Sequence, residues 1–193
     1  MPESDLAVVE RVILSRRTVK TFTGAPVERA AIERLLTLAV WAPNHRMHQP
    51  WRFAILDQAA ALRLATFLQN EPAIAAWPDP AKAQAKLGKL LDRLPQAGAL
   101  IQVAWVRDAD PAIDLEDHAA VSAAVEHILL GAQAQGLASY WATTAALGHP
   151  ATLAWCGFDP AREAHLGCIW LGTAAESPPA PPRRPLSQVA RFL

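Results

Sequence analysis

The chain has little of what nucleic-acid-binding, membrane and secreted proteins need. Its 18 Lys and Arg residues balance 18 Asp and Glu residues, so it lacks the basic excess that holds nucleic-acid phosphates. It also lacks an uncharged apolar run of about 18 residues or more, so we expect no transmembrane helix. The first residues are acidic and lack the basic and apolar regions of a signal peptide. These absences predict a cytoplasmic protein that binds neither nucleic acid nor membrane.

Cysteine and the common catalytic motifs are scarce as well. Cys156 and Cys168 are the only cysteines, and neither belongs to a CxxC or other paired ligand motif. We therefore expect two buried thiols rather than a disulfide or a metal site. The sequence contains no GxGxxG, no P-loop and no GxSxG. A dinucleotide, if one is used, is thus not bound in the Rossmann manner.

Apolar residues make up 52% of the 193 residues, enough for one domain or one protomer of an obligate dimer. Hydrophobic periodicity predicts helices over about 5–15, 28–41, 58–68, 81–94, 113–135 and 150–156, with a further helical turn after Asp159. It predicts strands over 51–56, 99–106 and 165–172, with weaker extended segments at 18–22 and 137–141. The pattern indicates one α+β sandwich over residues 1–193. Within it, we expect a variable lid region at 70–95 and an extended tail at 177–193 that wraps another surface.

Two pairs of arginines could bind an anion. Arg16 and Arg17 precede Thr18, and forked guanidinium groups beside a hydroxyl suit a phosphate. Lys20 lies on the same side of an extended segment as Thr18. Arg183 and Arg184 form the second pair, stiffened by flanking prolines. The alternative is that both pairs are simply solvated basic residues.

Two further segments carry binding groups. The loop 42–51 crowds amide, imidazole and guanidinium groups between a helix and a strand, although it could be only a polar surface loop. His45 and His48 make a poor zinc shell without a nearby carboxylate or thiol, so we expect no metal. The small residues of 136–145 would let a flat ligand approach the backbone, or would pack as an ordinary core turn.

Taken in order, these segments resemble the nitroreductase family. The resemblance rests on Arg16 to Phe22, on Ala42-Pro43 through Gln49-Pro50-Trp51, on the turn at 136–141, and on the Arg-Arg-Pro-Leu tail. The chain is most similar to the small members sometimes called YdjA-like. The resemblance implies a three-layer sandwich with a central, mostly antiparallel sheet of four to five strands flanked by helices. It also implies a homodimer with FMN at the interface and a C-terminal tail that wraps the partner subunit.

The resemblance also implies roles for individual residues. Arg16 and Thr18 would hold the FMN phosphate, with Arg17 beside them and Arg183 and Arg184 added from the tail. Lys20 would lie near flavin N1. The residues implied to reach the flavin ring or ribityl chain are Trp41 and His45 of the partner subunit, with Gln49, Trp141, Ala142 and Thr143. The helix end at Gly131, Gln135 and Gly136 would border the nicotinamide nucleotide.

The implied activity is that of an FMN-dependent NAD(P)H oxidoreductase. Hydride would pass through flavin N5, in ping-pong order, to a nitroaromatic, quinone or similar acceptor, and no side chain would act as a catalytic acid or base. Two positions depart from the larger members: Met47 replaces a loop asparagine, and Trp41 replaces a basic residue of some relatives. The alternative is a non-catalytic flavin-binding or partner-binding module on the same fold.

Overall fold

Four strands form the central layer of the molecule, in the order β1-β2-β4-β3. The computed structural model describes residues 3–76 and 80–192. Its strands are β1 (Trp51–Asp57), β2 (Ala99–Val106), β3 (Ala138–Ala142) and β4 (Glu163–Gly172). All three strand pairings are antiparallel, and β1 and β3 are the edge strands. The expectation of a mostly antiparallel sheet of four or five strands is confirmed.

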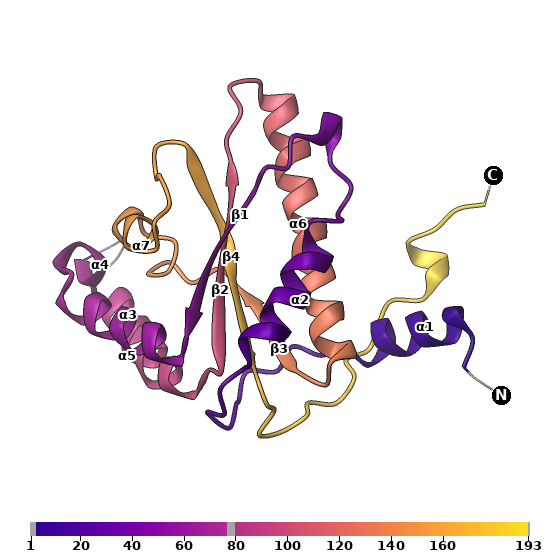
Figure 1. The fold of residues 1–193 in the computed structure, drawn as a ribbon, viewed down its shortest axis with the longest axis horizontal. Helices are drawn as coiled ribbons and strands as arrows, with labels where there is room; N and C mark the ends of the chain where they lie inside the picture. Colours follow the sequence, from indigo (N-terminus) through magenta and orange to yellow (C-terminus); the bar gives the residue numbers. More distant parts are fainter. Residues whose placement is uncertain (1–2, 77–79, 193) are drawn as a thin grey trace.

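Two helices cover one face of this sheet, α2 (Arg29–Ala39) and α6 (Pro111–Ala134) (Figure 1). The Asp110 carboxylate caps α6 by accepting from the Ala112 N–H at 2.9 Å. Gly136, at φ 73°, follows the last turn of α6 and ends the helix. Gly131 allows α2 and α6 to approach closely, since a Cβ there would lie 2.7 Å from a methyl group of Leu38.

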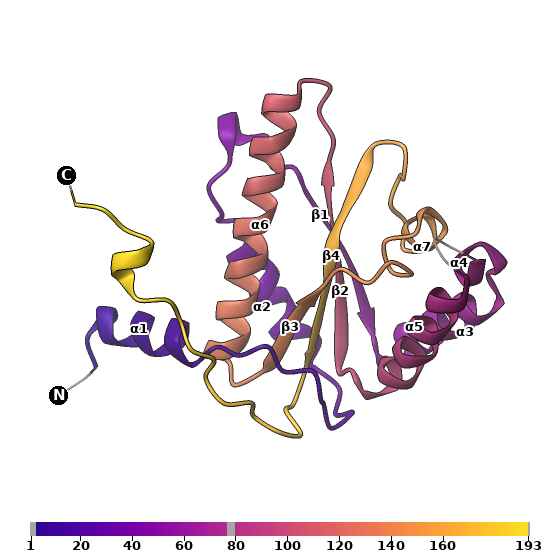
Figure 2. The same cartoon turned by 180° about the vertical axis from the view of Figure 1, so that it is seen from behind.

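The opposite face is covered by α3 (Gln58–Asn70), α4 (Pro72–Ala76), α5 (Pro80–Arg93) and α7 (Pro150–Trp155), as Figure 2 shows from behind. Asp57 caps α3, accepting from the Ala60 N–H at 2.7 Å. Helix α5 buries Leu87 and Leu90 in the core beneath it. The described part of 70–95 is therefore a packed layer of the sandwich, and its action as a lid stays a prediction. Residues 77–79 of this region lie outside the described residues.

Three connecting segments differ in detail from the sequence-based expectation. The segment 18–22 is not a strand, because it meets the sheet only at two isolated bridges, Thr18 to Ser139 and Phe22 to Ala174. The helical turn expected after Asp159 is a single hydrogen-bonded turn, because β4 begins directly after it at Glu163. The loop 44–50 contains a short 3-10 helix, η1 (His45–Met47).

Helix α1 (Asp5–Ser15) and the C-terminal tail project from the same side of the sandwich (Figures 1 and 2). Ser4 caps α1, but none of its residues is buried. Between residues 177 and 192, the tail contains one short 3-10 helix, η3 (Leu186–Gln188). None of the helices in the described ranges is long and apolar enough to span a membrane.

Candidate functional site

A pocket of about 310 Å³ lies where the end of α1 meets the C-terminal tail. Arg16, Arg17 and Thr18 line it from one side, and Arg183 lines it from the tail with three tail prolines. Arg184, which the resemblance also places at the phosphate, is not among the lining residues, and its role stays a prediction. The fold thus brings together two basic segments that are far apart in the sequence, as the resemblance implied for a phosphate site.

Arg16 and Arg17, at the end of α1, make different contacts. The Arg17 guanidinium donates to the carbonyl of Leu14 at 2.7 Å and to that of Arg16 at 2.8 Å, which satisfies carbonyls at the helix end. Arg16 leaves the helix in an extended conformation, and its Nε lies 3.6 Å from the Glu126 carboxylate of α6. That separation is long for a charge-assisted hydrogen bond. Arg16 is therefore the guanidinium better able to take an anionic ligand.

The same segment is bound to the start of β3. The Val19 N–H donates to the Ser139 carbonyl at 3.1 Å, and Thr18 forms a bridge with Ser139 near the start of β3. The side chain of Lys20 is exposed beyond this contact. Residues 16–18 therefore lie against the small-residue segment 136–145. The sequence indicated both segments as candidate binding segments.

Trp141 is fixed on β3 by a glycine that the sequence analysis missed. Its indole N–H donates to the Leu166 carbonyl at 3.2 Å, and the ring lies against Gly167. A Cβ at Gly167 would overlap the indole, and its φ of 152° is one that other residues rarely adopt. A glycine inside an otherwise apolar strand is the signal that could have found this contact. The indole remains 38% exposed and can meet a ligand.

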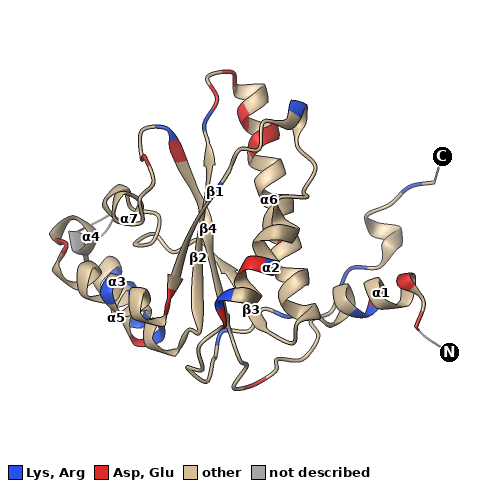
Figure 3. Ribbon diagram, viewed as in Figure 1, with Lys and Arg blue, Asp and Glu red and all other residues tan. Residues whose placement is uncertain are grey.

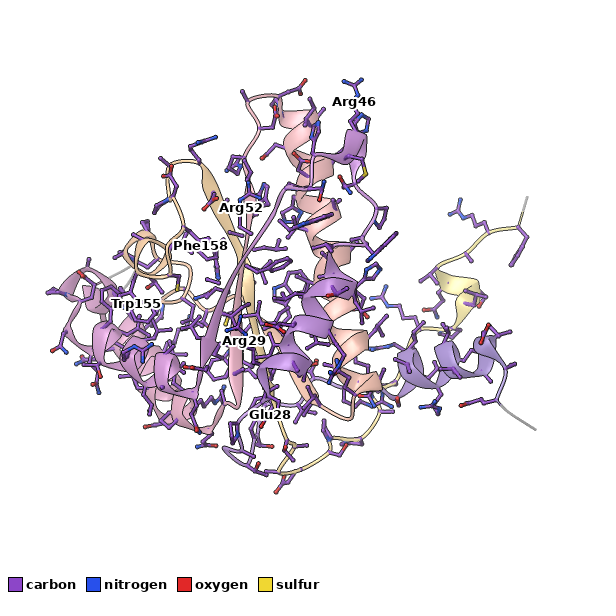
Figure 4. The ribbon with its side chains drawn as sticks, viewed as in Figure 1. Glu28, Arg29, Arg46, Arg52, Trp155 and Phe158 are labelled. Carbon is purple, nitrogen blue, oxygen red and sulfur yellow. The ribbon has the colours of Figure 1, made fainter. Side chains whose placement is uncertain are left out.

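The loop with His45 and Gln49 lies at another part of α6. His45 Nδ1 is 3.0 Å from the Glu116 carboxylate, and the neighbouring His48 is 3.3 Å from the buried Asp117. Figure 3 shows acidic positions along this end of α6, and Figure 4 places Arg46 at the same end of the molecule. Glu116 and Asp117 precede Glu126, the residue beside Arg16, by about ten residues, which is roughly 15 Å along the helix. Within one chain the loop does not reach the pocket at Arg16.

The loop is also held in an unusual backbone conformation. Arg46, Met47 and Gln49 have positive φ of 47°, 57° and 48°, which is uncommon for residues other than glycine. The Gln49 N–H donates to the Asn44 side-chain oxygen at 3.0 Å, which helps to hold this shape. Backbone strain of this kind is typical of loops with a binding role.

Trp41 lies after the last turn of α2 and is 80% exposed. It borders an apolar groove of about 360 Å³ between α1 and the α2–α6 layer. The other lining residues come from three helices: Val8, Val9, Val12, Ile13, Leu38, His127, Leu130, Gly131 and Ala134. Leu38 and Trp41 are more than two fifths exposed in this groove, as are Val9 and Ile13 of α1. It is therefore an uncovered hydrophobic surface rather than part of the core.

The three residues predicted beside a nicotinamide nucleotide have structural roles. Gly131 permits the contact between α2 and α6, and Gly136 ends α6 with a positive φ. The Gln135 side-chain oxygen accepts from the Arg34 guanidinium at 3.2 and 3.3 Å. Their contact with a nucleotide stays a prediction.

Ala142 and Thr143, the last two residues predicted beside the flavin ring, continue from Trp141. Ala142 packs partly against the core beneath α3 and α5. Thr143 is exposed and lines a separate pocket of about 390 Å³ beside α5. Sequence reasoning did not find this pocket, although it did predict a helix over 81–94.

Comparisons with known proteins agree on one family. The model of the nitroreductase family matches residues 13–173. Protein YfhC of Bacillus subtilis strain 168, provisionally named an NAD(P)H nitroreductase, is 27% identical over 135 residues, which cover 70% of this chain and 69% of YfhC.

Two solved structures share the fold over nearly all of the chain. A nitroreductase-like family protein from Bacillus cereus has a TM-score of 0.85 at 24% identity, covering 100% of this chain and 98% of its own. The FMN-dependent nitroreductase NfnB from Mycobacterium smegmatis, solved in complex with NADPH, has a TM-score of 0.75 at 20% identity. That match covers 98% of this chain and 100% of NfnB. At these identities the likeness shows the fold alone.

Proposed function

Because the chain belongs to the nitroreductase family, we propose that it is an FMN-dependent NAD(P)H oxidoreductase. The names of its relatives support this assignment: YfhC is named for NAD(P)H, and the NfnB structure for FMN and NADPH. The observation in this molecule that carries the proposal is the pocket at Arg16, Arg17, Thr18 and Arg183. Assignment to the small YdjA-like type stays a prediction.

The residues of this pocket fit a phosphate monoester. The charged side chains that line it are all guanidinium groups, Thr18 adds a hydroxyl, and no carboxylate of the described residues lines it. Glu126, the acidic neighbour of Arg16, is half exposed and 3.6 Å away, so its carboxylate can turn into solvent when a phosphate binds Arg16. Arg183 can approach from the stiff proline-rich tail. The phosphate end of FMN would therefore be bound mainly by Arg16, Thr18 and Arg183.

The residues beyond the phosphate would position the ring. Trp141 offers one exposed face of an indole that Gly167 and a hydrogen bond hold in place. Lys20, two residues after Thr18, would bring a positive charge to the N1 edge of the ring, where it stabilises negative charge. When bound, FMN supplies the redox chemistry, taking a hydride from NAD(P)H at N5 and passing electrons to a nitroaromatic, quinone or similar acceptor in ping-pong order.

We propose that the enzyme is a homodimer with the cofactor at the interface. Helix α1 has 11 residues and buries none of them, and a helix this short is marginal in water without tertiary packing. The apolar groove beside Trp41 offers the surface that a second subunit would cover. His45 and Gln49 cannot reach the Arg16 pocket of their own chain, so they would contribute to the site from the partner subunit. In the same arrangement the tail would wrap the partner.

The remaining organisation follows from the same fold. We propose that residues 1–193 form one domain, because the core clusters on both faces share the strands of one sheet.

Cys156 and Cys168 are free, and burial raises the pKa of the Cys156 thiol to about 11. Two unpaired, unreactive thiols are in keeping with a cytoplasmic location.

Replacement of Arg16 tests the cofactor assignment. We expect purified protein to be yellow, and we expect Arg16→Ala to bind FMN about 10- to 150-fold more weakly, because a hydrogen bond to a charged group contributes about 1.5–3 kcal/mol. FMN affinity is measured by fluorescence titration of the flavin-free protein. Arg11→Ala is the matched control, since Arg11 lies on α1 shortly before Arg16 but pairs with Glu3 at 3.1 Å and does not line the pocket.

A second measurement separates an enzyme from a flavin-binding module. The flavin-loaded protein is mixed with NADPH or NADH in a stopped-flow instrument without oxygen. Rapid bleaching of the flavin absorbance is expected of the oxidoreductase. Flavin binding without bleaching by either nucleotide would support the module, and a colourless protein that takes up no FMN would refute both.

A further inference from the structure

Two histidines hold the loop that contains η1 against α6. His45 Nδ1 lies 3.0 Å from the Glu116 carboxylate, and His48 Nδ1 lies 3.3 and 3.4 Å from the two carboxylate oxygens of Asp117. Figure 1 shows this loop beside the first turns of α6. Two consecutive carboxylates of one helix therefore pair with two histidines of one loop.

The two pairs differ in their exposure to water. The side chains of His45 and Glu116 are 44% and 52% exposed, so solvent screens their attraction. The Asp117 side chain is only 6% exposed, and among the described residues its carboxylate has no hydrogen-bond partner except His48. A buried carboxylate is costly without a partner, so its contact with His48 is strongly favoured. Asp117 is therefore the residue of α6 that fixes the loop.

The backbone on both sides of His48 is strained. Three residues of the loop have positive φ, a conformation that residues other than glycine keep only where their surroundings impose it: Arg46, Met47 and Gln49. His48 lies between the last two of these, with an ordinary φ of −59°. The contact of its side chain with Asp117 therefore acts next to the strained residues.

Gln49 is the residue of this loop that the resemblance directs to the flavin or the ribityl chain. Its backbone N–H donates to the Asn44 side-chain oxygen at 3.0 Å. Its side chain is exposed and forms no hydrogen bond with the described residues. The side-chain amide is thus free for a ligand, while the backbone that carries it is held from both sides.

We propose that Asp117 is a positioning residue for flavin binding. By holding His48, it fixes the loop so that the Gln49 amide of one subunit reaches the FMN bound mainly by the other. Asp117 does not touch the cofactor. It raises the affinity for FMN because a loop that is already ordered loses little conformational freedom when the cofactor binds. This inference rests on the proposed function and adds a residue that the motifs of the sequence did not indicate.

A double-mutant cycle in FMN affinity tests this role. The flavin-free forms of the wild type, Asp117→Ala, Gln49→Ala and the double variant are titrated with FMN. We expect each single substitution to weaken FMN binding about 3- to 10-fold, which corresponds to the loss of one hydrogen bond between neutral groups. The double variant should bind FMN like Gln49→Ala, because Asp117 acts only through that amide.

Glu116→Gln is the matched control. It removes a carboxylate from the neighbouring position of α6, where the histidine pair is open to solvent. We expect its FMN affinity to stay within about twofold of the wild type.

Met47 gives a second readout that a loss of stability alone would not change. The chain has two methionines, so protein labelled with ¹³C-methyl methionine gives a single signal from this loop, which Met47→Leu identifies. We expect saturating FMN to shift the Met47 signal in the wild type and in Glu116→Gln. In folded Asp117→Ala the shift should be smaller by half or more, because the loop no longer has one position.

Two results would overturn the inference: an FMN affinity that Asp117→Ala leaves unchanged, or an equal weakening by Asp117→Ala with and without Gln49. If Asp117→Ala does not fold, Asp117→Leu takes its place, because it also removes the acceptor but leaves no cavity. Wild-type protein that takes up no FMN would refute the proposed function and this inference with it. Wild-type protein that binds FMN with additive effects in the cycle would refute this inference alone.

Discussion

A partly buried histidine should make the stability of this protein depend on pH. His165 lies on β4, and its Nε2 is 3.0 Å from the side-chain oxygen of Gln102, a fully buried residue of β2. The Gln102 amide nitrogen in turn donates to the Leu147 carbonyl at 3.2 Å. Since the Gln102 oxygen can only accept, Nε2 of His165 donates to it. The network is therefore satisfied by the neutral imidazole.

Burial lowers the pKa of His165 from its usual 6.5 to about 4, and a backbone hydrogen bond at Gly167 opposes this shift only in part. The unfolded chain thus binds a proton at a pH where the folded protein does not. The resulting stability is fully present above the unfolded pKa of 6.5 and is lost as the pH falls toward 4. Integrating the proton linkage from pH 7.5 to pH 5 gives a loss of about 2 kcal/mol.

Urea unfolding at pH 7.5 and at pH 5 measures this loss. His165→Gln is the reference, because glutamine can still donate to Gln102 but does not titrate. We expect the wild type to lose about 2 kcal/mol more than the variant between the two pH values. Other groups that titrate in this range, such as exposed carboxylates, cancel in the comparison. Equal losses in both proteins would show that His165 is not held neutral by burial, and the reasoning would fail.

Two further substitutions test the site and the assembly. Gly167→Ala should displace the Trp141 indole and remove its hydrogen bond to β4, lowering stability by about 1–3 kcal/mol in urea unfolding, whereas Gly88→Ala, with open space around it, should be neutral or slightly stabilising. A Gly167→Ala protein as stable as wild type would contradict that contact. The wild type should be a dimer by light scattering, and Trp41→Asp should make it monomeric, while Leu62→Asp on the other face should not. A monomeric wild type would refute the dimer.

The sequence by itself determined the local structure of this protein. Ser4, Asp57 and Gly136 mark helix ends because a cap depends on backbone groups within one turn of the helix. The apolar run 99–106 forms the buried strand β2 because helices cover both faces of the sheet, so apolar side chains on either face are removed from water. The Arg-Arg-Thr motif likewise predicted a phosphate-binding chemistry, and its three residues line one pocket.

Only the tertiary structure decided which distant residues share a pocket. It placed Arg183 of the tail in the same pocket as Arg16, whereas Arg184 is not among the lining residues. It also placed the basic face of α5 over Tyr140 and Trp170, which no local pattern could show. Helix caps and strand alternation arise from neighbours along the chain. Pockets arise from how separate layers pack, and that depends on the side chains of every element between them.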